Sequence, residues 1–145
     1  MQAYYNLIDT LTTALLEDEN VNTCTNGGID EVDLKKQTIF PLSHFIINGF
    51  NYENGIYTFR VSVLCMDIVS DDKSGGSNEE DALNSQLAVI TKLMERLSGG
   101  DLYQSMFQLI GITSADKFVE RFENNLAGWG IDLEIQTPNL TIGIC

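Results

Sequence analysis

The stretch NYENGIYTFRVSVLCMDIVSDD, residues 51–72, decides the fold, because it joins a tight turn to a long run of strand-forming residues. Asn54-Gly55 between two apolar runs is the strongest short-range signal for a two-residue β-hairpin turn. Residues 42–50 predict the strand before the turn, and residues 56–69 predict the return strand. We therefore expect a long hairpin, followed by an acidic segment that begins at Asp71 and Asp72.

The two halves of the predicted return strand differ in their hydrophobic pattern. Over residues 56–62 apolar and polar side chains alternate, which is typical of a strand with one face in water. From residue 63 onward both faces are apolar, as in a covered central strand, with Asp67 as the exception. We interpret the first half as a projecting arm and the second half as its root in the sheet.

Two amphipathic helices are predicted, one at the N-terminus and one after the hairpin. Residues 71–78 (DDKSGGSN) are expected to form a flexible loop, after which Ser77 and Glu80 match a capping box that starts the second helix. Gly99-Gly100 ends that helix. The apolar positions recur at three- and four-residue steps: Tyr4, Leu7, Ile8, Leu11, Ala14 and Leu15 in the first helix, and Leu83, Leu87, Ile90, Met94 and Leu97 in the second.

Further strands are predicted before and after this core. Short strands are expected at residues 29–34, 102–110 and 117–122, and residues 128–139 alternate with Trp129, Ile131, Leu133 and Ile135 facing inward. Residues 139–145 fit either a further strand or a loose tail. Strands and helices do not alternate as crossover units, so we expect one α+β domain over residues 1–145. Its sheet is expected to be mostly antiparallel, with the helices on one face.

The charge of the chain restricts its partners. Eight Lys and Arg residues against 21 Asp and Glu residues give a net charge of −13. That charge opposes specific DNA binding and anionic membrane surfaces, because both attract basic patches. The acidic surface is either solubilising or functional. No stretch resembles a signal peptide or a membrane span, so we expect folding in a reducing cytoplasm.

Candidate catalytic side chains are few. His44 is the only histidine and has no nucleophile motif nearby, so we interpret it as structural. The cysteines Cys24, Cys65 and Cys145 lie far apart and form no zinc-ligand spacing. We expect Cys65 to be an inert core thiol, whereas Cys24 lies in a polar segment where it could react.

Acidic and glycine clusters have structural interpretations too. The acidic groups lack the spacing of a calcium loop, and the second group matches a helix N-terminus. The glycine pairs lack a phosphate-binding motif. We therefore predict no enzyme, no metal and no cofactor. The acidic groups are Asp71 with Asp72, and Glu79, Glu80 and Asp81.

The order of elements resembles that of the tail-terminator and head–tail connector (neck) proteins of tailed bacteriophages. The matching pieces are YYNLIDTLTTALL, FIINGFNYENGIYTFRVSVLCMDIV, EEDALNSQLAVITKLMERL and GWGIDLEIQTPN, whereas LSGGDLYQSMF is longer than the family pattern. The resemblance implies a structural virion protein that assembles in the host cytoplasm into a homo-oligomeric, commonly six-fold ring. Such a ring joins the tail tube to neck or connector proteins and lets DNA pass through its lumen without specific binding.

A ring subunit needs two different complementary surfaces. We expect the hairpin and the acidic segment to supply them, and we expect an acidic lumen to repel the sliding DNA. The candidate assembly residues are Tyr52, Asn54, Gly55, Tyr57, Arg60, Asp71, Asp72 and Trp129.

A second class of protein fits the same composition. Secretion chaperones of the type III kind are also small, acidic, cytoplasmic α+β proteins, and they act as dimers that hold an extended effector segment. In such a chaperone the apolar stripe of the second helix would be a dimer interface. The alternative is that this stripe covers the sheet of its own subunit.

Overall fold

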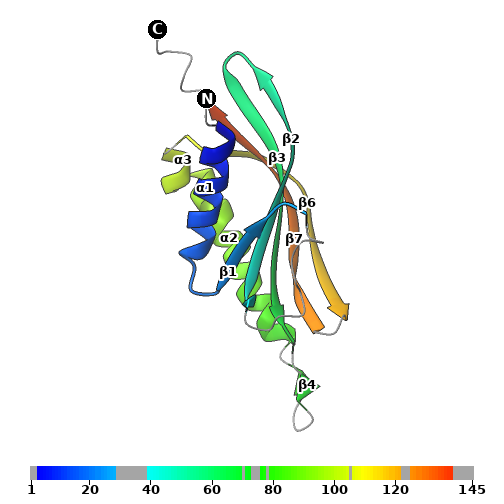
Figure 1. Cartoon of the computed structure of the whole chain (residues 1–145). Coiled ribbons are helices and arrows are strands. Elements are labelled where there is room, and N and C mark those ends of the chain that lie inside the picture. The colour runs from blue at the N-terminus through cyan, green and yellow to red at the C-terminus, as the bar shows by residue number, and fades with distance from the viewer. Residues whose placement is uncertain are drawn as a thin grey trace.

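The protein has an α+β fold in which two helices cover one face of a mostly antiparallel sheet (Figure 1). The computed structural model describes residues 3–28, 39–69, 71–72, 76–77, 79–104, 106–121 and 125–138. The five-stranded sheet has the order β1-β2-β3-β7-β6, and β4 pairs with β5 in a separate short hairpin. The elements are α1 (Ala3–Leu16), β1 (Thr23–Asn26), β2 (Leu42–Glu53), β3 (Ile56–Ile68), β4 (Asp71–Asp72), β5 (Gly76–Ser77), α2 (Glu79–Ser98), α3 (Asp101–Gln104), β6 (Gln108–Arg121) and β7 (Asn125–Pro138).

The predicted hairpin is present and forms the centre of the sheet. Asn54 and Gly55 both have positive φ (54° and 80°), as a two-residue hairpin turn requires. β2 and β3 pair from Leu42 opposite Met66 to Glu53 opposite Ile56. β1 lies parallel to β2, and the other neighbouring strands of this sheet are antiparallel.

The outer half of the hairpin is not the free two-stranded arm that its alternating pattern suggested. β7 pairs with β3 along its whole length, from Ile56 opposite Pro138 to Ile68 opposite Leu126. The polar residues of β3 lie on the outer face of the sheet, opposite the face that the helices cover. The hairpin still extends past the helices at one end of the molecule (Figure 1).

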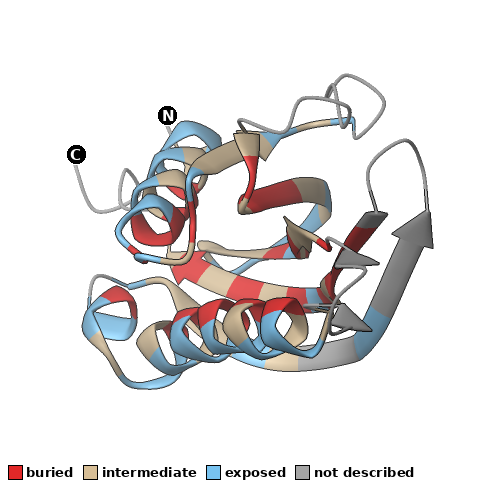
Figure 2. Ribbon diagram, turned by 90° about the horizontal axis from the view of Figure 1, so that it is seen from below, coloured by how far each residue is buried: buried red, intermediate tan, exposed pale blue. Residues whose placement is uncertain are grey.

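The main core lies between the helices and one face of the sheet, which we call the inner face. In Figure 2 the buried residues of the helices lie on the sides that face the strands. Phe45, Phe59 and Ile135 are among the sheet residues that pack in this core. The helix residues buried in this core are Leu7, Leu11, Ala14 and Leu15 of α1 and Val89, Ile90, Leu93 and Leu97 of α2.

The buried face of α2 differs from the predicted stripe by a small rotation. Leu87 is 42% exposed, whereas Gln86 is fully buried and donates from Nε2 to the Asn20 carbonyl (3.3 Å). This orientation lets α2 contact both the sheet and the segment that follows α1. The apolar stripe therefore covers the sheet of its own subunit, apart from Leu87.

The outer face of the sheet has a polar half and an apolar half. Around the C-terminal end of β3, a second cluster contains the buried residues Leu42, Met66 and Leu126. Toward the hairpin turn, Arg60 is exposed and Ser62 is half-buried. The division that the pattern of residues 56–69 predicted is confirmed.

Several predicted boundaries were wrong. Thr23–Asn26 forms β1 in a segment where no strand was expected, because pairing with β2 outweighs its polar composition. The predicted strand at residues 102–110 begins as α3, and the two predicted strands merge into β6 because β7 pairs with it throughout. Part of the expected loop at residues 71–78 is the β4–β5 hairpin. The strand expected at residues 29–34 and the tail at residues 139–145 lie outside the described residues.

The described helices do not include one that is both long enough and apolar enough to cross a bilayer.

Candidate assembly surface

The outer end of the hairpin carries a group of aromatic side chains on the inner face, which we call the aromatic surface: Phe50, Tyr52 and Tyr57. Phe50 lies directly opposite Phe59 in the strand register, and Tyr52 lies opposite Tyr57. Phe59 is buried in the main core, and Tyr57 packs against that core. The aromatic surface is therefore an outward continuation of the core.

Ring contacts hold these side chains together. The ring centroids of Tyr52 and Tyr57 are 4.7 Å apart, and those of Phe50 and Tyr57 are 5.7 Å apart. Tyr57 stacks on Phe59 at 5.5 Å with an interplanar angle of 17°. Such contacts stabilise a fixed arrangement of rings. Even so, 55% of Phe50 and 46% of Tyr52 remain exposed.

A β-bulge in β2 places Phe50 and Tyr52 on this face. The register passes from Ile47 opposite Val61 to Gly49 opposite Arg60, which leaves Asn48 as the extra residue. Without the bulge, strict alternation from Ile47 would turn Phe50 to the outer face. The chain thus contains one additional residue whose effect is to gather the aromatic rings on one side.

Beside the aromatic surface, the outer half of β2 has no partner strand on one side among the residues that the structure describes. β1 pairs only with Leu42, Ser43, His44 and Phe45, so within the described ranges no strand pairs with this side of residues 46–53. The other edge strand of the sheet is β6. Its register shifts leave Ile110 and Thr113 as bulged residues, and bulges at an edge discourage pairing with another chain.

The outer face of the same hairpin is polar. The amide of Asn48 donates to the Ser62 hydroxyl (2.8 Å), which donates to Oδ1 of Asp132 (2.6 Å). These residues and Arg60 line a shallow depression across three strands. Opposite faces of the hairpin therefore differ in chemistry, aromatic on one side and hydrogen-bonding on the other.

The predicted assembly residues separate into groups. Tyr52, Asn54, Gly55 and Tyr57 lie together at the hairpin end, as expected from the sequence. Arg60 belongs to the outer face of that hairpin, where Nη1 donates weakly to Asn51 Oδ1 (3.5 Å).

Asp71 and Asp72 form β4, which Figure 1 places at the end of the molecule opposite the hairpin turn. The acidic segment and the hairpin therefore cannot contact the same site on one neighbouring protein. They are two separate surfaces at opposite ends of the subunit.

Trp129 has an internal role in the subunit. Its indole N–H donates to the Leu83 carbonyl (2.8 Å) and so connects β7 to the first turns of α2. The neighbouring Gly128 allows a close approach, since a Cβ there would overlap the Cys65 carbonyl of β3. The glycines around Trp129 serve contact between strands of the same chain.

Phe50 was not identified from the sequence as part of the surface. The signal that could have identified it is Asn48-Gly49 inside a strand, since glycine within a strand is typical of a bulge. A bulge at Asn48 reverses the face of every later residue in β2. Phe50 and Tyr52 then share a face with Phe45 and Ile47.

His44 has the structural role that the sequence suggested. It is fully buried, and its Nε2–H donates to the Gly27 carbonyl (2.7 Å) while the Thr25 hydroxyl donates to Nδ1 (2.7 Å). A carbonyl oxygen only accepts, so this arrangement selects the neutral tautomer with the proton on Nε2. Burial lowers the pKa of His44, which opposes a role as a positively charged group.

The thiols of Cys24 and Cys65 are poor nucleophiles in this environment. Burial raises the pKa of Cys24 to about 11 and that of Cys65 to about 12. The Cys65 Sγ lies 3.5 Å from the Ser43 hydroxyl inside the core. A thiol is reactive as its thiolate, which is scarce at neutral pH for such values. In the part of the chain that the structure describes, no group of three or more potential metal ligands is close enough to hold an ion.

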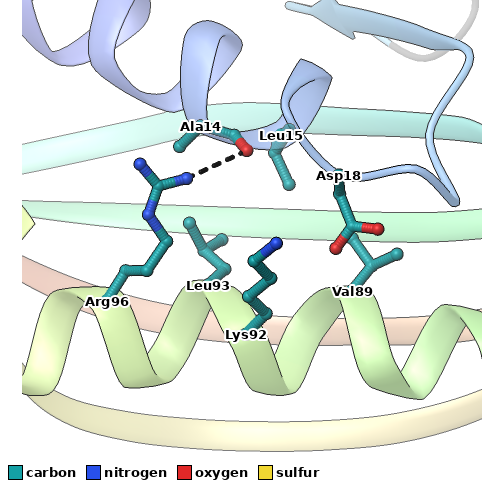
Figure 3. Close-up of a pocket in the computed structure, with 7 residues that line it drawn as sticks. All are labelled: Ala14, Leu15, Asp18, Val89, Lys92, Leu93 and Arg96. Carbon is teal, nitrogen blue, oxygen red and sulfur yellow. Dashed lines mark hydrogen bonds between the residues drawn. The ribbon is translucent and has the colours of Figure 1, made fainter. Parts of the chain in front are cut away.

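Arg96 of α2 connects the three helices to one another. Figure 3 shows its guanidinium reaching from α2 to the C-terminal end of α1, where Nη1 donates to the Ala14 carbonyl (3.2 Å). Nε and Nη2 donate to both carboxylate oxygens of Asp101 in α3 (2.8 and 2.7 Å), and Nη2 lies 3.2 Å from Glu17. The guanidinium lowers the pKa of Asp101 to about 2. This ion-pair group connects the helices to one another within their layer.

Neither a protein-family model nor a curated protein sequence matches this chain.

Proposed function

We propose that this chain is a structural subunit of a tailed bacteriophage, a tail terminator or neck protein that forms a ring on the tail tube. The observation that carries the proposal is the aromatic surface, which continues the core into solvent at the projecting end of the sheet. Half-exposed aromatic rings beside an open strand edge are typical of a protein–protein contact. The order of helix, long hairpin, helix and closing strands supports the same class of protein.

A closed ring requires two unlike surfaces on each subunit. The outer half of β2, beyond its pairing with β1, and the edge strand β6 can meet that requirement, because the two strands differ in sequence, length and shape. Bulges occupy the first half of β6, so residues 115–121 are its regular part. Adjacent subunits in the proposed ring use the hairpin end on one side and a different surface on the other.

The mass of the purified protein in solution tests the proposal. Native mass spectrometry or light scattering is expected to find a hexamer, or a monomer that forms rings only when tail tubes are added. Electron microscopy of tubes mixed with the protein would then show a ring at the tube end. A monomer that leaves tube ends bare would contradict the proposal.

A dimeric secretion chaperone of the type III kind is the second candidate function. The open edge of β2 beside the aromatic surface favours it, since an extended effector segment could add to that edge. The same mass measurement separates the two proposals, because the chaperone is expected to be a dimer. The burial of the α2 stripe in its own subunit argues against α2 as the dimer interface.

A further inference from the structure

We propose that the aromatic surface binds residues 140–144 of a second copy of this chain, added as an extended strand beside residues 46–53 of β2. This inference rests on the proposed self-assembly and names the contact that it uses. The surface, the open edge, the sequence of the segment and its point of departure each support it.

The aromatic surface is ready to bind an apolar segment. Phe50, Tyr52 and Tyr57 are already held by mutual ring contacts, so little side-chain freedom is lost when they are covered. Glu53 is the only charged residue in the outer part of β2. An uncharged, apolar partner therefore fits this surface better than a charged one.

The neighbouring edge supplies the backbone contacts. On the side away from β3, residues 46–53 of β2 have no strand beside them among the residues that the structure describes. An extended segment that adds to a sheet edge binds through main-chain hydrogen bonds, and its alternate side chains lie on one face of the sheet. That face can be the inner face, which carries Phe50 and Tyr52.

The sequence after β7 has the pattern that such a strand needs. In NLTIGIC, residues 139–145, the apolar side chains of Leu140, Ile142 and Ile144 alternate with Thr141 and Gly143. An extended strand would place all three on one face, above the aromatic rings. The segment has no charged side chain, so it adds no like-charge repulsion at the contact itself.

The geometry favours a second copy over the same subunit. β7 ends at Pro138, opposite Ile56 at the hairpin turn, so the segment departs beside the aromatic surface but on the wrong side of β3. Reaching the open edge of the same subunit means crossing three strand spacings, about 14 Å. At about 3.3 Å per residue this crossing uses roughly four residues. Within one subunit, Leu140 and Ile142 would then lie in the connection across the strands. In a second copy, both residues remain available to contact the aromatic surface.

Crosslinking through the natural Cys145 tests the contact. In a Tyr52→Cys variant, a short bismaleimide is expected to join the thiol introduced into β2 of one copy to Cys145 of another. The products would be covalent dimers and larger species on a denaturing gel. Cys24 and Cys65 react slowly because burial raises their pKa values. Peptide mass spectrometry of the products identifies the linked pair.

Two controls accompany this experiment. Asn51→Cys places the thiol on the outer face of the same strand and is expected to crosslink far less, and the unchanged chain measures links between two Cys145 thiols. Equal yields from Tyr52→Cys and Asn51→Cys would overturn the inference. So would a link that forms only within one copy, since that would make the occupant the subunit's own segment.

A pair of substitutions separates this inference from the ring proposal. Ile142→Asp is expected to weaken self-association at least tenfold, because it brings an unpaired carboxylate onto aromatic rings. Thr141→Asp adds the same charge on the other face of the strand and is expected to change self-association little. Rings that form equally well with both variants would overturn the inference and leave the ring proposal standing. A chain that never forms rings but crosslinks selectively through Tyr52→Cys would support the contact and contradict the ring.

Discussion

His44 illustrates how a single buried side chain connects distant parts of the chain. Its two ring nitrogens bond with Thr25 and Gly27, so it fixes β1 and the following residues against β2. The parallel β1–β2 pairing is short, and each of its four residue pairs matters for that edge. The neutral imidazole is required, because the positively charged form would be desolvated in this site.

We expect the free energy of unfolding to fall as the pH is lowered through 6.5, the ordinary pKa of histidine. The folded protein holds the pKa of His44 below that value, so the unfolded chain takes up a proton first and is favoured by acid. Urea unfolding at a series of pH values measures this slope, and His44→Gln is expected to remove it. A slope that persists in His44→Gln would contradict this assignment.

Two carboxyl groups change the free energy of unfolding at lower pH, and their effects have opposite signs. Arg96 lowers the pKa of Asp101 from 3.8 to about 2, so that stabilisation is lost only as the pH falls through this range. Burial raises the pKa of Asp67 above 3.8, so its protonation favours the folded state just above that pH. The range of Asp101 lies below the onset of the His44 effect at pH 6.5.

Gly128→Ala is expected to destabilise the protein by about 1–3 kcal/mol. The added methyl group would overlap the backbone of Cys65 and Met66 in β3, and backbone cannot rotate away as a side chain can. Thermal unfolding measures the change. Gly99→Ala is the matched control, because nothing lies within 4 Å of a Cβ at that position. Equal effects of the two substitutions would show that the close approach of β7 to β3 is unimportant.

At the scale of elements, Arg96 provides a polar connection between the helices of the layer. α1 and α2 pack on the inner face through apolar residues, but α3 is a short helix with Leu102 as its buried residue. Arg96 contacts the end of α1 and the start of α3, so it sets the spacing of the helices. The position of α3 in turn determines where β6 begins.

Replacing Arg96 by Met is expected to lower the free energy of unfolding by about 1–2 kcal/mol. The change leaves the Ala14 carbonyl and the carboxylates of Glu17 and Asp101 without this donor. Lys92→Met is the control, since Lys92 is exposed on the same helix one turn earlier. Chemical denaturation compares them, and a Lys92→Met variant as unstable as Arg96→Met would refute the special role of Arg96.

The whole molecule has two chemically different ends. The hairpin turn and the aromatic surface lie at one end, and β4 with the acidic N-terminal turn of α2 lies at the other (Figure 1). In the proposed ring the aromatic end contacts a neighbouring protein, and the acidic end lies toward an anion that it repels. That anion is the DNA in the lumen.

Replacing Asp71 and Asp72 by Lys is expected to slow DNA passage and reduce infectivity, because a basic lumen would bind phosphates instead of repelling them. Phage assembled with the variant subunit would be compared in an infection assay and a DNA-ejection assay. Glu95→Lys, an exposed acid near the other end of α2, is the control for added charge. Normal infectivity and ejection with both variants would count against an acidic lumen.

The sequence by itself determined the elements whose signals are local. Asn54-Gly55 specified the turn through its positive φ angles, and the periodic apolar residues specified α1, α2 and the alternating part of β7. The net charge of −13, read from the composition alone, predicted that specific nucleic-acid binding is unfavourable. Each of these signals acts within a few residues or in the composition as a whole.

Only the tertiary structure decided what depends on residues far apart in the chain. β1 is a strand because β2 lies beside it, β6 is continuous because β7 pairs along it, and Gln86 replaces Leu87 in the core because the segment after α1 is near. The aromatic surface depends on a single bulge at Asn48, since one extra residue reverses the face of all that follow. Long-range pairing and packing outweigh local preference at these positions, and the candidate assembly surface is formed at one of them.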